Sequence, residues 1–107
     1  MELKKFHEIA LSFPETESNL HFDRIAFKVT GKRIFATILE SSLSANIKLN
    51  IVDQSVFCSF NKLHIYSVPN KWGSQGWTTF EIDKLLSEIL IDALECAYNE
   101  VIKPTKV

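Results

Sequence analysis

The chain contains few of the residues that usually mark disulfide-stapled or metal-bound domains. Its 107 residues include only two cysteines and three histidines. Cys58 and Cys96 lie far apart and in no CxxC or zinc-ligand spacing, so we expect buried free thiols within apolar helical patterns. His7, His21 and His64 have no histidine partner at i+4 and no carboxylate or cysteine at a ligand spacing. The sequence therefore predicts no metal and no cofactor.

Long apolar runs are also absent. No run approaches the roughly 20 residues of a membrane-spanning helix, and residues 1–13 lack the apolar region of a signal peptide. A chain of this length should bury roughly two-thirds of its unfolded surface, which is enough for one core without staples. We expect a single domain over residues 1–107, reduced, soluble and cytoplasmic, with no membrane partner.

The sequence shows none of the common catalytic or phosphate-binding motifs. GxSxG, GxxxxGK[ST] and GxGxxG do not occur, and no pair of isolated carboxylates ends a strand. No motif points to an enzyme, so an enzyme or small-ligand binder at the tryptophan loop (residues 69–76) is the least supported hypothesis.

Charge is unevenly distributed along the chain. The formal net charge is −1, but residues 24–76 carry seven lysines and arginines against two carboxylates, while both ends are acidic. This division along the chain matters more than the small net charge, because only the middle of the chain is basic.

Residues 68–83 form the most unusual stretch, because they hold both tryptophans and two of the three glycines. Pro69, Gly73 and Gly76 predict a shaped loop with exposed backbone, whose free N–H groups could hold an anion. The aromatic and β-branched residues from Trp77 to residue 82 then predict a strand, and Asp83 can cap a following helix.

The remaining elements follow from hydrophobic periodicity. Apolar residues at helical spacing predict a first helix that ends near Ser12 or Phe13. They also predict a short helix that is capped by Asp53 and has Val56, Phe57 and Phe60 on one side. A long helix is expected from about Lys84 to Ile102, where Pro104 ends it and residues 106–107 form a frayed tail. Alternation predicts strands at about 22–29, 33–39, 46–51, 62–68 and 77–82, with a hairpin turn at residues 30–32. The polar, acidic residues 14–20 are expected to be a loop.

The predicted order is α-β-β-β-α-β-β-α. It indicates an α+β domain of two layers, a five-stranded antiparallel sheet with helices on one face. Two layers leave the other face of the sheet uncovered.

Alternation also predicts which side chains lie on the uncovered face. If the apolar strand residues, Leu63 among them, point at the helices, their neighbours point away. Those neighbours are Arg24, Lys28, Asn46, Lys48, Asn50, Lys62, His64, Tyr66, Trp77, Thr79 and Glu81. Cations, amides and aromatic rings suit a nucleic-acid surface, but a solvated face or a dimer contact fits the same pattern. Trp72 has two interpretations, a plug over the end of the core or a stacking contact.

Several segments together resemble one known family. Residues 13–17 (FPETE), 27–32 (FKVTGK), 46–49 (NIKL) and 71–78 (KWGSQGWT) have the order and spacing of the MmcQ/YjbR family, over nearly the whole chain. The resemblance implies a two-layer α+β fold similar to secretion chaperones and CyaY-like domains of bacteria. It also implies a function that is not established, for which DNA binding through a double-wing arrangement has been suggested.

The resemblance singles out Lys32, Lys48 and Trp77. Family members often have a shorter, more basic turn where this chain has Trp72 and Gln75. Our first hypothesis is a non-enzymatic binding module that contacts DNA, and the alternative is a protein-interaction or dimerisation domain using the same face. The expected binding residues are Arg24, Lys28, Lys32, Lys48, Lys62, Tyr66, Lys71, Trp72, Gln75 and Trp77.

Overall fold

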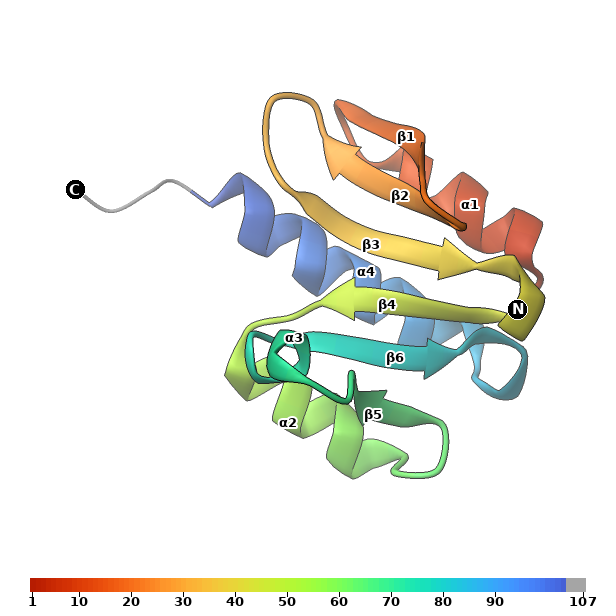
Figure 1. The fold of residues 1–107 in the computed structure, drawn as a ribbon, viewed down its shortest axis with the longest axis vertical. Helices are drawn as coiled ribbons and strands as arrows, with labels where there is room; N and C mark the ends of the chain where they lie inside the picture. The colour runs from red at the N-terminus through yellow and green to blue at the C-terminus, as the bar shows by residue number, and fades with distance from the viewer. Residues whose placement is uncertain (104–107) are drawn as a thin grey trace.

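A computed structural model describes residues 1–103, and it has the two-layer α+β architecture that the sequence predicts (Figure 1). All strands join one antiparallel sheet, in the order β1-β2-β3-β4-β6-β5. Helices α1, α2 and α4 lie behind this sheet, while the short α3 lies in front of it (Figure 1). The elements are α1 (Leu3–Ser12), β1 (Thr16–His21), β2 (Arg24–Val29), β3 (Ile34–Leu39), β4 (Ser44–Lys48), α2 (Ile51–Phe60), β5 (Ile65–Ser67), α3 (Lys71–Ser74), β6 (Trp77–Glu81) and α4 (Ser87–Ile102), with 3-10 turns at Glu40–Ser42 and Ile82–Lys84.

The sheet has six strands rather than the expected five. The additional strand is β1, which pairs with β2 over its whole length in the region expected to be a loop. It lies at the edge of the sheet and none of its residues is buried, so it has no alternation of apolar and polar residues. Without a buried face, an edge strand leaves no periodic signal in the sequence.

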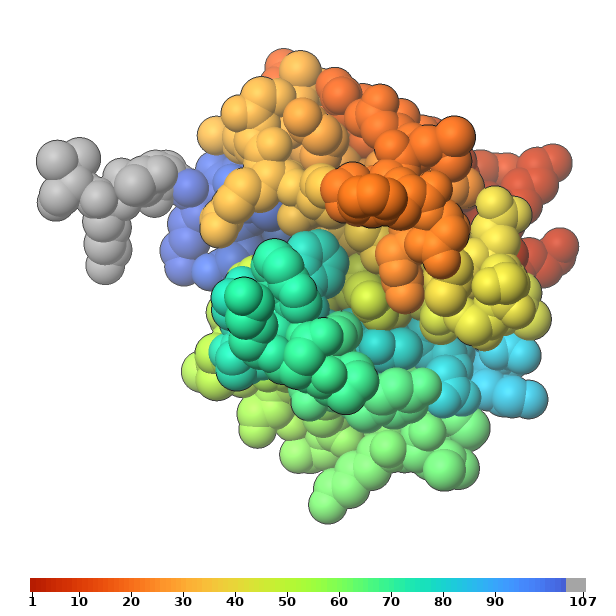
Figure 2. All heavy atoms as spheres, viewed as in Figure 1, coloured from red at the N-terminus to blue at the C-terminus, as the bar shows by residue number. Residues whose placement is uncertain are grey.

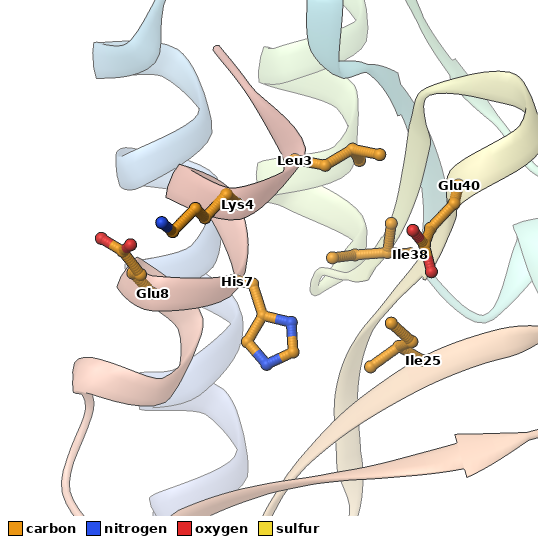
Figure 3. A pocket seen from close by; sticks show the side chains of 7 residues that line it. All are labelled: Leu3, Lys4, His7, Glu8, Ile25, Ile38 and Glu40. Carbon is orange, nitrogen blue, oxygen red and sulfur yellow. The ribbon is translucent and has the colours of Figure 1, made fainter.

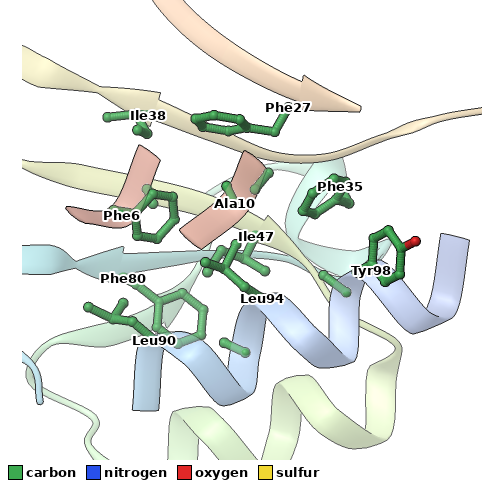
Figure 4. Packing of buried hydrophobic residues seen from close by; sticks show 14 of the residues in the cluster. Phe6, Ala10, Phe27, Phe35, Ile38, Ile47, Phe80, Leu90, Leu94 and Tyr98 are labelled. Carbon is green, nitrogen blue, oxygen red and sulfur yellow. The ribbon is translucent and has the colours of Figure 1, made fainter. Parts of the chain in front are cut away.

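The core lies between the sheet and the helices behind it (Figure 4). Most of its largest fully buried side chains come from α1, the strands β2 to β6 and α4. Tyr98 on α4 closes one end, with its ring stacked 4.7 Å from that of Phe13 and its hydroxyl donating to the carbonyl oxygen of Pro14 (2.9 Å). The predicted first helix and the apolar stripe of the last helix are therefore confirmed.

A β-bulge in the β2–β3 pair determines which β3 residues face the core. Phe27 pairs with Ala36 but Lys28 pairs with Ile34, so Phe35 is the extra residue. Phe35 and Ala36 are both completely buried. As a result Ile34 lies beside Lys28 on the opposite, open face of the sheet.

The middle of the chain departs most from the expected pattern. Asn50, not Asp53, caps α2, because its Oδ1 accepts from the backbone N–H of Asp53 (2.8 Å). Val56 and Phe60 do not join the core but are 62% and 64% exposed. Leu63 is 75% exposed, because the following strand begins only at residue 65.

The last helix also begins later than expected. Asp83 lies in a 3-10 turn, and α4 starts at Ser87 without a side-chain cap. The expectations for Pro104 and residues 106–107 fall outside the described residues. Cys58 and Cys96 are free thiols but only half-buried, and burial raises the pKa of each. No helix within residues 1–103 is both long and apolar enough to span a membrane.

Candidate nucleic-acid interface

The strand register brings the basic and aromatic side chains together on the open face. Lys48 on β4 pairs directly with Trp77 on β6, and one row along the sheet Thr37, Asn46 and Thr79 are neighbours. The Oγ1 of Thr79 donates to Oδ1 of Asn46 (2.8 Å). These residues alternate with the buried Ala45, Ile47 and Phe80, so they belong to the face away from the helices.

The loop that carries Trp72 is held by hydrogen bonds from both sides. Asn70 Oδ1 accepts from the backbone N–H of Trp72 (2.8 Å), which starts the single turn of α3. From α2, the Nε2 of Gln54 donates to the carbonyl oxygens of Gly73 (2.9 Å) and Trp77 (3.3 Å). The loop predicted from the glycines therefore contains one helical turn, fixed against the rest of the protein.

Gly76 is required where this loop returns to the sheet. Its φ of +107° is a conformation that side chains disfavour, and a Cβ there would lie 1.8 Å from the carbonyl oxygen of Leu49. The backbone N–H of Leu49 donates to the carbonyl oxygen of Gly76 (3.0 Å). This contact joins the start of β6 to the end of β4, and Trp77 follows immediately.

A groove lies on the open face between the β1–β2 turn and α3. In Figure 2 the orange segment around that turn and the green segment that includes α3 project on either side of the hollow. Its first compartment has a volume of about 330 Å³. It is lined by His21, Arg24, Ile34, Thr37, Asn46, Val68, Trp72 and Trp77. The compartment is mostly apolar at the tryptophans and polar on the strand side, where Nη1 of Arg24 donates to Oγ1 of Thr37 (3.2 Å).

The second compartment adjoins the first and is rich in positive charge. It has a volume of about 490 Å³ and shares Ile34, Trp72 and Trp77 with the first compartment. The rest of its lining is Lys28, Lys32, Arg33, Lys48, Gln75, Glu100 and Val101. Within residues 1–103 the ion pairs are His64 with Glu81 and Lys84 with Asp83, so none of these four cations is ion-paired there.

Lys48 is a half-buried cation of the second compartment. Burial lowers the pKa of its ammonium group, and the nearby positive charge of Arg33 lowers this pKa further to a smaller extent. Glu100 acts in the opposite direction but also accepts from Nδ2 of Asn50 (3.4 Å). The compartment therefore has more positive charge than its own carboxylate compensates, which favours binding of an anion.

The β1–β2 turn, which forms the side of the groove opposite α3, carries an exposed aromatic ring. Phe22 is 91% exposed and has a φ of +61°, a rare backbone conformation for a bulky residue. Its ring lies edge-on to that of His21, with 5.0 Å between centroids. The rim opposite α3 thus presents a second aromatic surface beside the groove.

Seven of the ten expected binding residues line this groove. They are Arg24, Lys28, Lys32, Lys48, Trp72, Gln75 and Trp77. Lys62 and Tyr66 lie elsewhere, around a hollow between α2 and β5, and Lys71 is exposed on α3 and lines neither compartment. Asn50 was also expected on the open face, but it caps α2.

Tyr66 belongs to a separate polar cluster at the β5–β6 edge. Its hydroxyl donates to Oε2 of Glu81 (2.7 Å), and Nδ1 of His64 lies 2.9 Å from Oε1 of the same carboxylate. The hydrogen bond from Tyr66, and next that with His64, lowers the pKa of Glu81. The cluster ties the last strand to its neighbour.

Sequence reasoning missed several groove residues. His21 was hidden because its strand was taken for a loop, whereas Arg33, adjacent to Lys32 in the same turn, could have been added from the sequence. Ile34 faces the groove only because of the bulge. Glu100 comes from the far end of the chain, and no local pattern brings it to β4.

Another hollow lies between α1 and the sheet (Figure 3). It has a volume of about 410 Å³, and His7, Ile25 and Ile38 are among its lining residues. Lys4 and Glu8 point away from the His7 ring, which packs edge-on against Phe27 with 5.1 Å between centroids. No group of three or more potential metal ligands occurs in the described part of the chain. This hollow therefore lacks the converging charges of the groove.

Comparison with known proteins gives the fold but no function. The crystal structure of the Deinococcus radiodurans protein DR2400, which has a DUF419 family domain, is similar with a TM-score of 0.82 and 18% sequence identity. The likeness covers 98% of this chain and 81% of that chain. No family model and no curated protein matches the chain. At this identity the similarity establishes a shared fold alone.

Proposed function

We propose that this protein is a binding module that binds single-stranded nucleic acid in the groove on the open face of its sheet. DNA is the expected ligand. The observation that supports this most is the gathering of two tryptophans and five cations around one groove, from segments between residues 24 and 77. Cations neutralise phosphates, and aromatic rings stack on bases.

The chemistry of the groove favours a single strand over a duplex. Trp72 is 50% exposed and Trp77 is half-buried, so both rings contribute to the groove wall and remain accessible to a ligand. A base can stack on such a ring only when its own face is free, as in a single strand. Asn46 and Arg24 add hydrogen-bonding groups that can reach base edges.

The resemblance to the MmcQ/YjbR family supports the same proposal, since the suggested role of that family is DNA binding. We infer that the chain is MmcQ/YjbR-like, on the strength of the four motifs named above and a fold shared with a DUF419 protein. Two residues that the resemblance singles out, Lys48 and Trp77, are paired across β4 and β6.

The test is a titration monitored by tryptophan fluorescence, because the only two tryptophans of the chain both line the groove. A single-stranded oligonucleotide should quench them at low salt. If three phosphates are neutralised, log K should fall with log salt with a slope of about −2. Trp72→Ala should weaken binding by roughly 1–3 kcal/mol through lost stacking.

The control variants are Lys62→Ala and Lys71→Ala, which remove lysines that lie outside the groove. They should leave the affinity nearly unchanged, whereas Lys28→Ala and Lys48→Ala should weaken it and make the salt slope shallower. No quenching at low salt, or a duplex of the same sequence binding more tightly than the single strand, would contradict the proposal.

A second candidate function, association with another copy of the chain, draws support from a different surface. The outward face of α2 exposes Val52, Val56 and Phe60 at a spacing of four residues, and Leu63 lies three residues beyond the end of the helix; each is more than 60% exposed. Such a contiguous apolar patch is typical of an interface. Sedimentation should then show a dimer that Val56→Lys dissociates without loss of oligonucleotide binding. A wild-type protein that stays monomeric at high concentration would exclude this candidate.

A further inference from the structure

The groove is divided into two compartments of different chemistry that meet at the tryptophans. One compartment joins the aromatic rings to the hydrogen-bonding groups of Arg24, Thr37 and Asn46. The other joins the same rings to four cations. A ligand that fills both compartments needs a flat, hydrogen-bonding part directly connected to an anionic part.

The cations of the second compartment converge from three places in the fold. Lys28 is on β2, Lys32 and Arg33 are in the turn that follows it, and Lys48 is on β4. One carboxylate, that of Glu100, lines the same space. An internal phosphodiester carries a single negative charge, whereas a phosphate monoester has a second pKa near 6 and carries about −1.5 to −2 at pH 7. The surplus of cations suits the monoester better.

The polar groups of the first compartment are already oriented. Asn46 uses its Oδ1 to accept from Thr79, which leaves its Nδ2 as a donor, and Arg24 uses Nη1 on Thr37, which leaves its other N–H groups. Donors beside an aromatic ring fit the carbonyl oxygens and ring nitrogens on the edge of a stacked base.

We propose that the groove recognises a nucleotide unit that ends in a phosphate monoester, with its base in the compartment of Arg24 and Asn46 and its phosphate among Lys28, Lys32, Arg33 and Lys48. The unit is either a free nucleoside monophosphate or the phosphorylated end of a single strand. This inference rests on the proposed function and makes it specific, because the internal phosphates of a strand would bind less tightly in the same place.

The experiment compares short thymidine oligonucleotides that differ only at their ends: 5′-phosphorylated, 3′-phosphorylated and unphosphorylated. Thymidine 5′-monophosphate, thymidine and inorganic phosphate are titrated in parallel, all followed by tryptophan fluorescence. One of the two terminal phosphates should raise the affinity about tenfold or more, as a charge-assisted contact does. Lys48→Met should abolish this gain, whereas Lys62→Met should retain it.

The three strands, the monophosphate and thymidine together separate the possible outcomes. If the monophosphate binds and thymidine does not, the proposal is supported and the ligand is a free nucleotide. If only a phosphorylated strand binds, the proposal is supported and the ligand is the phosphorylated end of a strand. Equal binding of all three strands overturns this inference but leaves single-strand binding intact. Binding of the monophosphate without any strand retains the inference and refutes the proposed function, and no binding of any ligand refutes both. If Lys48→Met does not fold, Lys28→Met tests the same compartment from another strand.

Discussion

Replacing Gly76 with alanine tests whether the tryptophan loop is held against the sheet as described. At Gly76 the new Cβ would meet the carbonyl oxygen of Leu49 at 1.8 Å, and the φ is +107°. Gly31 is the matched control, because its φ is also positive, at +76°, but nothing lies within 4 Å of its Cβ position. Comparing the two separates the cost of backbone conformation from the cost of the close approach.

The expected costs differ by more than the experimental error. A left-handed backbone conformation costs an alanine about 1–2 kcal/mol, which is the whole effect expected at Gly31. At Gly76 the chain must also move away from Leu49, and overpacking together with the strained hydrogen bond between these residues adds about 2–3 kcal/mol. Gly76→Ala should therefore lower the free energy of unfolding by about 3–5 kcal/mol.

Urea denaturation followed by fluorescence measures both variants. With a denaturant slope of about 2 kcal/mol per M, the midpoint should fall by roughly 0.5–1 M for Gly31→Ala and by roughly 1.5–2.5 M for Gly76→Ala. Equal shifts for the two variants would refute the close packing of Gly76 on Leu49, and with it the placement of Trp77.

Three further contacts can each be tested by substitution. Asn50→Ala should lower the free energy of unfolding by about 1 kcal/mol through loss of the α2 cap, and Asp53→Asn should change it much less; the reverse order in urea midpoints would restore the cap expected from the sequence. Because the folded pKa of Glu81 lies below its unfolded value, its contribution to stability is present above the unfolded pKa and is lost as the pH falls through the folded pKa. Glu81→Gln should thus show a smaller loss of stability than wild type between neutral pH and pH 3, and parallel pH profiles would contradict this. Tyr98→Phe should cost about 0.5–1.5 kcal/mol in urea denaturation, because its hydroxyl no longer donates to the carbonyl oxygen of Pro14, and an unchanged midpoint would argue against that bond.

The fold could be predicted where one side of a helix or strand is buried and the other side is exposed to solvent. Strands β2, β4 and β6 satisfy this condition, and so do α1 and α4, so their periodicity is visible in the sequence. β1 fails it because both its faces are largely exposed. α2 fails it differently, since Val56 and Phe60 are apolar yet point outward, so its apolar residues misidentify its buried side.

The candidate site could be predicted in part for the same reason. Alternation placed Lys28, Lys48 and Trp77 on one face, and this geometry is what the structure has. It could not reveal that a bulge turns Ile34 to that face, or that α3 and the β1–β2 turn convert a flat sheet into a groove. Lys62 was misplaced because alternation was extended beyond a strand of three residues.

The most direct test of the central claim is amide and indole chemical-shift mapping by NMR during titration with a 5′-phosphorylated single-stranded oligonucleotide. The account predicts that the indole N–H signals of Trp72 and Trp77 shift first, together with amides of β2, β4 and residues 31–34, while the outward face of α2 is unaffected. Shifts confined to α2, or the absence of any shift at low salt, would contradict it.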